Sequence, residues 1–177
     1  AVCSTGILLC GLLILSQQEE YRTGELAYGT LAETVINLPE PSHAQSSEHP
    51  EQPQQEEPIL QVDFDALKNI NPDVVGWLYC PNTVISYPVV QGEDNVYYLN
   101  HLFDGRQNSS GCLFLDSRCE GWDGKNSVIY GHHMKNGTLF ASLENYQDPL
   151  YYEAHPRLFL LTPDSVLTID LFSAYVT

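Results

Sequence analysis

A histidine pair directly follows a short apolar segment and a glycine at residues 127–134 (SVIYGHHM). The β-branched and aromatic residues at 127–130 predict a strand, and Gly131 permits a sharp turn or a close approach of the backbone. A histidine at the end of a strand can face a cleft, and its near-neutral pKa suits proton transfer. His132 is therefore a candidate general acid and base, although a loop histidine without a chemical role fits the spacing equally well.

The five cysteines do not form a catalytic or metal-binding motif. No Cys-x-x-Cys pair occurs, which argues against a zinc ribbon or a thioredoxin-type site. Cys112 and Cys119 could form a disulfide outside the cell, or both could be free thiols. Cys80 precedes a proline and Cys119 lies in a loop, and a cysteine hydrolase that uses one of them is a competing interpretation.

His132 and the adjacent His133 lack the spacing of a metal site. Neighbouring residues at the end of a strand point apart, and neither His-x-His nor His-Glu-x-x-His occurs. No group of acidic residues has the spacing of a calcium loop. The sequence therefore predicts no metal and no other cofactor.

The chain is strongly acidic, because 23 Asp and Glu residues outnumber 7 Lys and Arg residues and give a formal net charge of −16. Contact with phosphate groups needs clustered Lys and Arg, so nucleic acid is excluded as a partner. The same shortage excludes attachment to anionic lipid through a basic patch. An acidic surface suits a soluble domain that works outside the cell.

Composition divides the 177 residues into four segments. Residues 1–16 are uncharged and apolar, slightly shorter than the ~20 residues of a full span, and predict a partial transmembrane anchor; a cleaved signal peptide and a buried core helix are the alternatives. The acidic residues that follow indicate the outer side of the membrane. Residues 17–37 predict an amphipathic helix, residues 38–58 a disordered acidic linker rich in Pro and Gln, and residues 59–177 the globular domain.

The globular domain alternates short apolar segments with turn residues. Four strands are predicted, at 74–79, 84–90, 111–116 and 127–130, and a hairpin is predicted from 157–162 and 166–172. Pro88 indicates that the second strand lies at an edge or contains a bulge. Short helices are predicted near 63–70 and 140–146, and a short helix or a turn is predicted at 97–99. Many short strands separated by turns indicate a mainly β fold, either a barrel or a sandwich.

The histidine motif at 130–134 (YGHHM), followed by Gly137 and Phe140, resembles that of the class B sortases, cysteine transpeptidases of the Gram-positive cell surface. Segments on both sides also resemble this family: 71–78 (NPDVVGWL), 87–91 (YPVVQ), 95–99 (NVYYL), 111–116 (GCLFLD), 151–156 (YYEAHP) and 172–175 (FSAY). The apolar N-terminal segment and the helix with 21–25 (YRTGE) match the family layout. The resemblance implies a sortase-type β-barrel with short helices, preceded by a membrane helix and an amphipathic helix.

The resemblance also implies a mechanism. A cysteine thiolate attacks the Thr carbonyl of an NPxTN- or LPxTG-like sorting signal, and the resulting thioacyl-enzyme is resolved by an amine of the cell wall or of a pilin. His132 matches the histidine that protonates the leaving amine and deprotonates the incoming one, and His133 is secondary. Asn95, Leu99 and Tyr130 match positions that line the sorting-signal pocket, although each also fits ordinary packing. The implied location is the cell membrane, with a single span and an extracellular catalytic domain.

The family's nucleophile lies later in the chain, in a T-x-(S/T)-T-C-like segment, and an arginine that stabilises the oxyanion follows it. Neither group is matched within residues 1–177. The sequence is therefore expected to be truncated before the catalytic cysteine and arginine, with an incomplete barrel, and residues 1–177 alone are expected to be inactive. The alternative function is a sortase-like surface module that binds peptide without catalysis.

Overall fold

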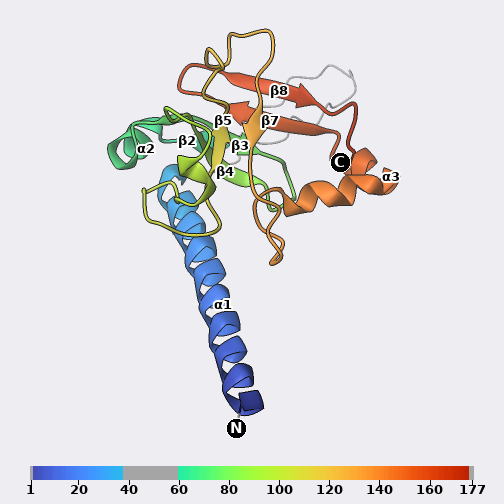
Figure 1. Ribbon diagram of the computed structural model, residues 1–177. Helices are drawn as coiled ribbons and strands as arrows, with labels where there is room; N and C mark the ends of the chain where they lie inside the picture. Colours follow the sequence, from blue (N-terminus) through green and yellow to red (C-terminus); the bar gives the residue numbers. More distant parts are fainter. Residues whose placement is uncertain (1, 38–59, 176–177) are drawn as a thin grey trace, which may run out of the picture.

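A computed structural model describes residues 2–37 and 60–175, with side chains described from Cys10 onward. It contains one long helix and one main sheet that is surrounded by short helices (Figure 1). The linker predicted at 38–58 lies outside the described residues.

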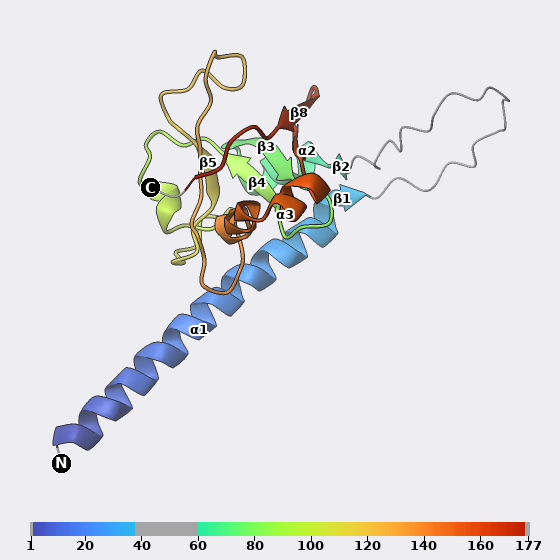
Figure 2. The same cartoon turned by 90° about the vertical axis from the view of Figure 1, so that its right-hand side faces the viewer.

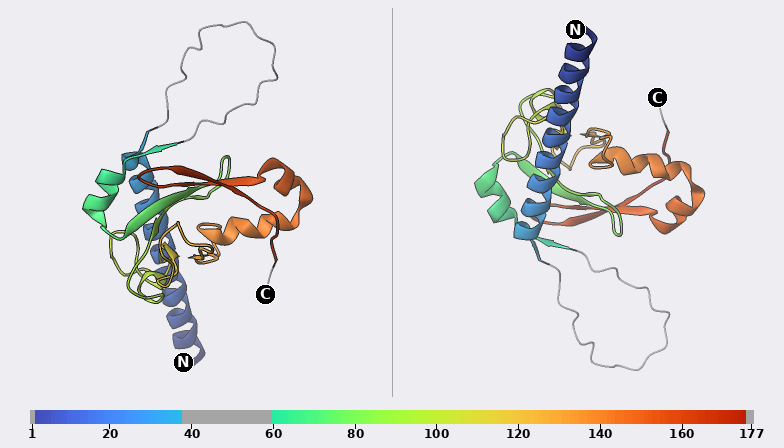
Figure 3. Two further views of the ribbon diagram at one scale, coloured as in Figure 1. Left: turned by 90° about the horizontal axis from the view of Figure 1, so that it is seen from above. Right: turned by 90° about the horizontal axis from the view of Figure 1, so that it is seen from below.

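The main sheet contains six strands in the order β6-β5-β4-β3-β7-β8. β4 and β5 run parallel, and the other neighbouring strands run antiparallel. The sheet is curled like half of a barrel (Figure 3), which agrees with the predicted mainly β fold with short helices. The strands are β3 (Val74–Tyr79), β4 (Ser86–Val90), β5 (Leu113–Leu115), β6 (Ile129–Tyr130), β7 (Arg157–Leu161) and β8 (Val166–Asp170).

β3 lies inside the sheet and carries the largest fully buried side chain, that of Trp77, which is 0% exposed. The indole of Trp77 donates to the hydroxyl of Ser86 on β4 at 3.1 Å. A bulge leaves Val75 without a partner on β4, and its carbonyl accepts a hydrogen bond from the indole of Trp122 at 2.8 Å. The backbone polar group exposed by the bulge is therefore satisfied inside the fold.

Of the two positions predicted from Pro88, the edge is wrong, because β4 lies between β3 and β5. A bulge does occur in the pairing of β4 with β3, between Val74 and Gly76. Pro88 is opposite Trp77 of β3, whereas pairing with β5 begins one residue later, at Val89. Pro88 therefore does not need an N–H for the β5 ladder. A proline is tolerated inside this sheet because β5 is too short to reach it.

α1 (Val2–Val35) is a single helix that runs through the segment predicted as a membrane anchor at 1–16 and through most of the segment predicted as an amphipathic helix at 17–37. Its N-terminal part extends away from the sheet (Figure 2), whereas Tyr28 and Val35 near its other end are buried in the core. Within the described residues, no helix combines the length and the apolar character needed to cross a membrane.

Two short strands, β1 (Ile36–Asn37) and β2 (Gln61–Val62), pair after α1 and lead into α2 (Phe64–Ile70). Asp63 is the N-cap of α2, and its side chain accepts a hydrogen bond from the backbone N–H of Ala66 at 2.9 Å. The remaining helices are η1 (Tyr97–Leu99), η2 (Phe140–Gln147) and α3 (Pro149–Ala154). The short helices near 63–70, 97–99 and 140–146 are thus confirmed.

The N-cap of α2 gives a first test of the fold. We expect Asp63→Ala to lower the free energy of unfolding by about 1 kcal/mol, because it leaves a helix N–H without its acceptor. Asp65→Ala removes an acidic residue from the first turn but keeps the cap, and is expected to change stability by only a few tenths of a kcal/mol. Equal losses for the two variants in urea unfolding would contradict this role for Asp63.

Candidate active site

His132 lies two residues beyond the end of β6, a strand at one edge of the sheet. The register that pairs Tyr130 with Phe114 of β5 fixes where this strand ends. The backbone N–H of Phe140 then donates to the carbonyl of His132 at 3.1 Å and closes the loop between them. The structure therefore presents His132 at a strand end, as the sequence predicts.

Gly131 is packed too closely for a side chain. A Cβ at this position would clash with the side chain of Leu113 and would come within 2.7 Å of the ring of Phe140. The φ of Gly131 is not positive, so backbone conformation does not require a glycine here. The lack of space for a Cβ does. The tight contact holds the backbone immediately before His132 against β5 and η2.

The ring of His132 is hydrogen-bonded to a segment far away in the sequence. Its Nε2 lies 2.7 Å from the backbone carbonyl oxygen of Leu99, the last residue of η1. His132 is partly exposed, and Leu99 is 39% exposed. Of the four residues predicted for the site, His132 and Leu99 are thus in direct contact, through the imidazole of His132 and the backbone carbonyl of Leu99.

Two carboxylates, those of Asp94 and Asp73, hold η1 in place. The carboxylate of Asp94 accepts hydrogen bonds from the backbone N–H groups of Val96 and Tyr97, each at 2.8 Å. These bonds lower the pKa of Asp94, and the bond from the N–H of Tyr97 has the largest effect. Tyr98 is buried and donates its hydroxyl to Asp73 at 2.7 Å. The carbonyl that contacts His132 is therefore carried by an anchored turn.

A buried carboxylate, that of Asp116, organises the loop after β5. Its side chain is 3% exposed. It accepts hydrogen bonds from the backbone N–H and the guanidinium of Arg118, at 2.7 to 2.9 Å, and from the hydroxyl of Tyr130 at 2.9 Å. Arg118 in particular holds the pKa of Asp116 well below its usual range, and the bond to Asp116 raises the pKa of Tyr130. The predicted site residue Tyr130 is thus fixed by its hydroxyl.

The same loop is attached to the segment that carries Asn95. The side-chain oxygen of Asn95 accepts a hydrogen bond from the backbone N–H of Ser117 at 2.8 Å. Gln91 donates to the carbonyls of Asp116 and Cys119 at 3.1 and 2.7 Å. The loop at 116–119 therefore links Asn95 to Tyr130, while Leu99 is linked to His132.

Sequence reasoning missed the residues that build this framework, above all Asp116 and Arg118. A signal was present, since Asp116 ends the apolar segment at 111–116. A buried acid requires paired donors, and the basic residue two positions later was available to provide them. The sequence did not reveal that Tyr130 would be the other donor.

The Asp116 network predicts a particular pH dependence of stability. Because its folded-state pKa is lowered, its contribution to the free energy of unfolding is complete above the unfolded value of about 3.9 and is lost as the pH falls towards the folded value. We expect Asp116→Asn to lower stability at neutral pH and to flatten its pH dependence between about pH 5 and pH 2, so that the two proteins converge in acid. Urea unfolding at a series of pH values measures this.

The matched control is Asp123→Asn, which removes one exposed carboxylate from the following loop. This variant should follow the pH dependence of the unchanged protein. A constant difference between Asp116→Asn and the unchanged protein at every pH would contradict the ionic role of Asp116.

His133 has a different partner from His132. Its Nε2 lies 3.1 Å from the carboxylate of Glu144, and both side chains are more than half exposed. A pair this exposed contributes little to stability. Within the described residues, no group of three or more His, Cys, Asp or Glu side chains is arranged to hold a metal ion.

Three of the described cysteines, Cys80, Cys112 and Cys119, lie in and around the sheet, and the fourth, Cys10, is exposed on α1. Cys80 is 0% exposed and its thiol lies near the carbonyl of Arg157, whereas Cys119 is partly exposed and lies near the carbonyl of Asn126. Burial raises the pKa of the Cys112 thiol to about 12. All three are free thiols. A thiolate nucleophile must be ionised and accessible, which argues against Cys80 and Cys112.

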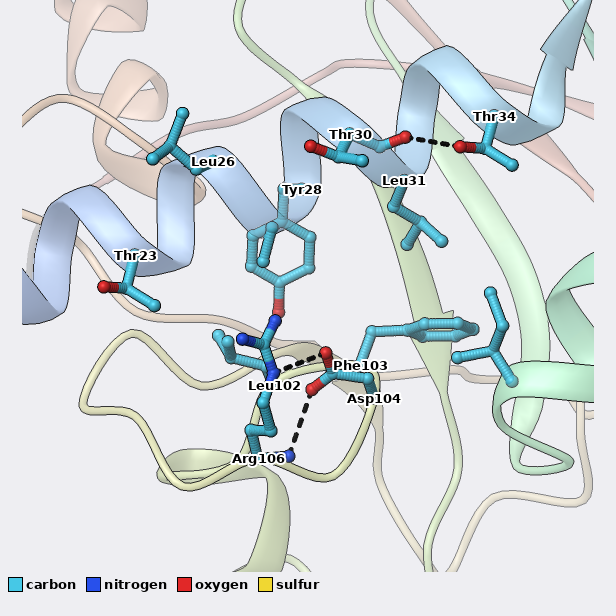
Figure 4. A pocket seen from close by; sticks show the side chains of 12 residues that line it. Thr23, Leu26, Tyr28, Thr30, Leu31, Thr34, Leu102, Phe103, Asp104 and Arg106 are labelled. Atoms are coloured by element: carbon cyan, nitrogen blue, oxygen red, sulfur yellow. Dashed lines mark hydrogen bonds and ion pairs between the residues drawn. The ribbon is translucent and has the colours of Figure 1, made fainter.

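Two grooves flank the sheet. One, of about 640 Å³, lies beside η2 and is lined by His133, Phe140, Leu143 and Leu171 among others. The other, of about 480 Å³, lies between α1 and the loop at 102–106, and Asp104 and Arg106 form an ion pair at its rim (Figure 4). The first groove adjoins the histidine loop, whereas the second contains none of the predicted site residues.

The chain was compared with family models, curated proteins and solved structures. No family model matches the chain. It is 38% identical over 112 residues to sortase B of Listeria monocytogenes, covering 63% of this chain and 46% of that protein. It is similar to the structure of B. anthracis sortase B in complex with AAEK2, with a TM-score of 0.70, 29% identity and coverage of 88% of this chain and 67% of the other.

It is also similar to the Staphylococcus aureus sortase B–substrate complex, with a TM-score of 0.58, 36% identity and coverage of 63% of this chain and 52% of the other. The chain spans about half the length of the curated relatives it matches. The histidine motif, the half-barrel sheet and these similarities agree with one another, and over the part compared the chain is similar to the class B sortases.

Proposed function

We propose that this chain is the histidine-bearing part of a sortase-type transpeptidase that cleaves a C-terminal sorting signal and joins the released protein to an amine. The observation that carries the proposal is the placement of His132, partly exposed at a strand end, with Nε2 2.7 Å from the Leu99 carbonyl. A partly exposed histidine that is held in one orientation, in a loop that adjoins a groove, is suited to proton transfer.

The proposed reaction has two acyl-transfer steps. A cysteine thiolate forms a bond to the Thr carbonyl carbon of an NPxTN- or LPxTG-like signal, and the bond from that carbon to the next residue's nitrogen breaks. Protonated His132 gives its proton to the leaving amine. Neutral His132 then takes a proton from the incoming amine, whose nitrogen attacks the thioester and releases the thiolate.

Three residues are proposed to contact the sorting signal: Asn95, Leu99 and Tyr130. Their support is that Leu99 and Tyr130 are each more than a third exposed. The Leu99 carbonyl contacts His132, and Tyr130 lies two residues before His132 in the chain. Asn95 uses its side-chain oxygen on Ser117. Its amide N–H groups are then left to donate to a peptide carbonyl.

We propose that the nucleophilic cysteine and the oxyanion-stabilising arginine belong to sequence beyond residue 177. The buried positions of Cys80 and Cys112, and the use of Arg118 by Asp116, support this. Residues 1–177 alone are therefore expected to be inactive. The protein that includes the further residues is called the extended protein below.

The proposed acceptor is an amine of a cell-wall peptide or of a pilin, and the proposed location is the outer face of the cell membrane. The acidic composition supports work outside the cell. The apolar residues Leu12, Leu13, Ile14 and Leu15 are each more than half exposed on α1 and would provide attachment. Protease treatment of intact cells should remove residues 60–175, and protection of these residues would reject an extracellular location.

The activity is tested with the extended protein and a fluorogenic peptide that carries the sorting signal, with and without a glycine-peptide amine. Cleavage together with formation of the amide-linked product supports the transpeptidase. Peptide binding without cleavage favours the alternative, a non-catalytic sortase-like surface module. A scrambled peptide of equal composition is the control, and equal cleavage of both peptides would reject specific recognition.

A further inference from the structure

The contact between His132 and Leu99 determines which nitrogen of the imidazole carries the proton. A carbonyl oxygen only accepts hydrogen bonds, so a separation of 2.7 Å requires that Nε2 carries a hydrogen and donates it. In the neutral ring, Nδ1 then has the free lone pair. The hydrogen bond at one ring nitrogen thus sets the role of the other.

Gly111 supports the Leu99 carbonyl from beneath. Its φ is +61°, and a Cβ there would come 2.5 Å from the carbonyl oxygen of Tyr98 and 2.8 Å from that of Leu99. The backbone N–H of Cys112 also donates to the Tyr98 carbonyl at 2.9 Å. Two successive carbonyls of η1 therefore rest on the backbone at 111–112, with no room for a side chain.

α1 fixes Gly111 from the other side. The hydroxyl of buried Tyr28 donates to the carbonyl of Gly111 at 2.5 Å. Figure 4 shows the ring of Tyr28 directed from α1 towards the loop that carries Leu102. Contacts thus run from Tyr28 through Gly111 and Leu99 to the imidazole of His132.

We propose that the Leu99 backbone carbonyl is the group that fixes His132 as its Nε2–H tautomer, so that Nδ1 exchanges the proton in catalysis. Gly111 is the positioning residue that keeps this carbonyl in place. The reacting partners of Nδ1 rest on the proposed function, whereas the tautomer is a property of the chain itself. When Nδ1 gains a proton, the imidazolium still donates from Nε2 to Leu99, and the proton later leaves from Nδ1 to the leaving amine.

The ring nitrogens of His132 are measured by ¹⁵N NMR in the 177-residue protein at a pH where the imidazole is neutral, with His132→Gln to assign the signals. We expect separate signals for a protonated Nε2 and an unprotonated Nδ1, with the Nε2 proton protected from exchange with water. Gly111→Ala should displace the Leu99 carbonyl and give averaged signals and an unprotected proton. Averaged signals in the unchanged protein, or a protonated Nδ1, would overturn the proposal.

A second variant covers the case in which Gly111→Ala does not fold. Replacing the backbone N–H of Asn100 by an ester oxygen makes the Leu99 carbonyl a weaker acceptor and adds no atoms beneath it. The N–H that is lost makes only a 3.3 Å bond to the carbonyl of Tyr97. The same replacement at Gly105, whose N–H donates to Leu102 at 2.9 Å, is the matched control.

The ester at Asn100 is expected to average the His132 signals and to lower kcat/KM of the extended protein roughly tenfold to a hundredfold. The control ester should leave both unchanged, and equal effects of the two esters would reject a positioning role for the carbonyl.

The two proposals fail separately. If the unchanged protein shows the fixed tautomer and the His132→Gln variant of the extended protein remains active, the proposed function is rejected and the tautomer assignment is kept.

Discussion

His132→Gln is expected to lower kcat for sorting-signal cleavage by the extended protein about 10²- to 10⁴-fold, the range typical of a lost general acid and base. Glutamine keeps a donor that can reach the Leu99 carbonyl, but it does not exchange protons near neutral pH. Peptide binding should change little, because the proposed contacts to the sorting signal come from other side chains. The rate is measured with the fluorogenic peptide, and binding is measured by titration.

The matched control is His133→Gln, the neighbouring imidazole. Its partner is the exposed Glu144, and its loss is expected to change kcat less than about threefold, in keeping with the small worth of an exposed pair. Equal losses for the two variants would show that the motif tolerates no change at either position, which contradicts the assignment of proton transfer to His132.

Gly131→Ala is expected to lower the free energy of unfolding by about 1–3 kcal/mol, the usual cost of overpacking a closed site. The added Cβ would be forced against Leu113 and the ring of Phe140. Because the displaced backbone leads directly into His132, activity of the extended protein should fall as well, by about a hundredfold for a shift of ~1 Å. Urea unfolding and the peptide assay measure the two effects.

Gly124→Ala provides the control for Gly131→Ala. A Cβ at Gly124 would meet only the carbonyl oxygen of Asn126, at an ordinary 3.7 Å. This variant should stay within about 0.5 kcal/mol of the unchanged protein and keep its activity. If Gly131→Ala were as stable and as active as Gly124→Ala, the close packing before His132 would have no functional consequence.

The strands of the sheet could be predicted because their apolar residues are continuous and bounded by turn residues. The hairpin β7–β8 is confirmed around Pro163, Asp164 and Ser165, where the chain must turn. The position of β4 could not be predicted, because Pro88 excludes an interior strand only where a neighbour needs its N–H. The short length of β5 removes that need, and no local pattern in the sequence shows how far a partner strand extends.

The candidate site was accessible to sequence reasoning in part. His132 follows an apolar segment and a glycine, which indicates a strand end, and the resemblance named Asn95, Leu99 and Tyr130. Their contacts could not be derived, since His132 reaches Leu99 through a backbone carbonyl 33 residues away in the chain. A backbone acceptor has no residue type that would reveal it.

The central claim is that His132 transfers protons to and from the reacting amines beside a nucleophilic cysteine thiolate supplied from beyond residue 177. The most direct measurement is the rate of alkylation of each thiol in the extended protein across the pH range, with the modified cysteine located by mass spectrometry. We predict that a cysteine beyond residue 177 reacts first and that its pH–rate profile changes in His132→Gln. First reaction at Cys80 or Cys119, or an identical profile without the imidazole, would contradict the account.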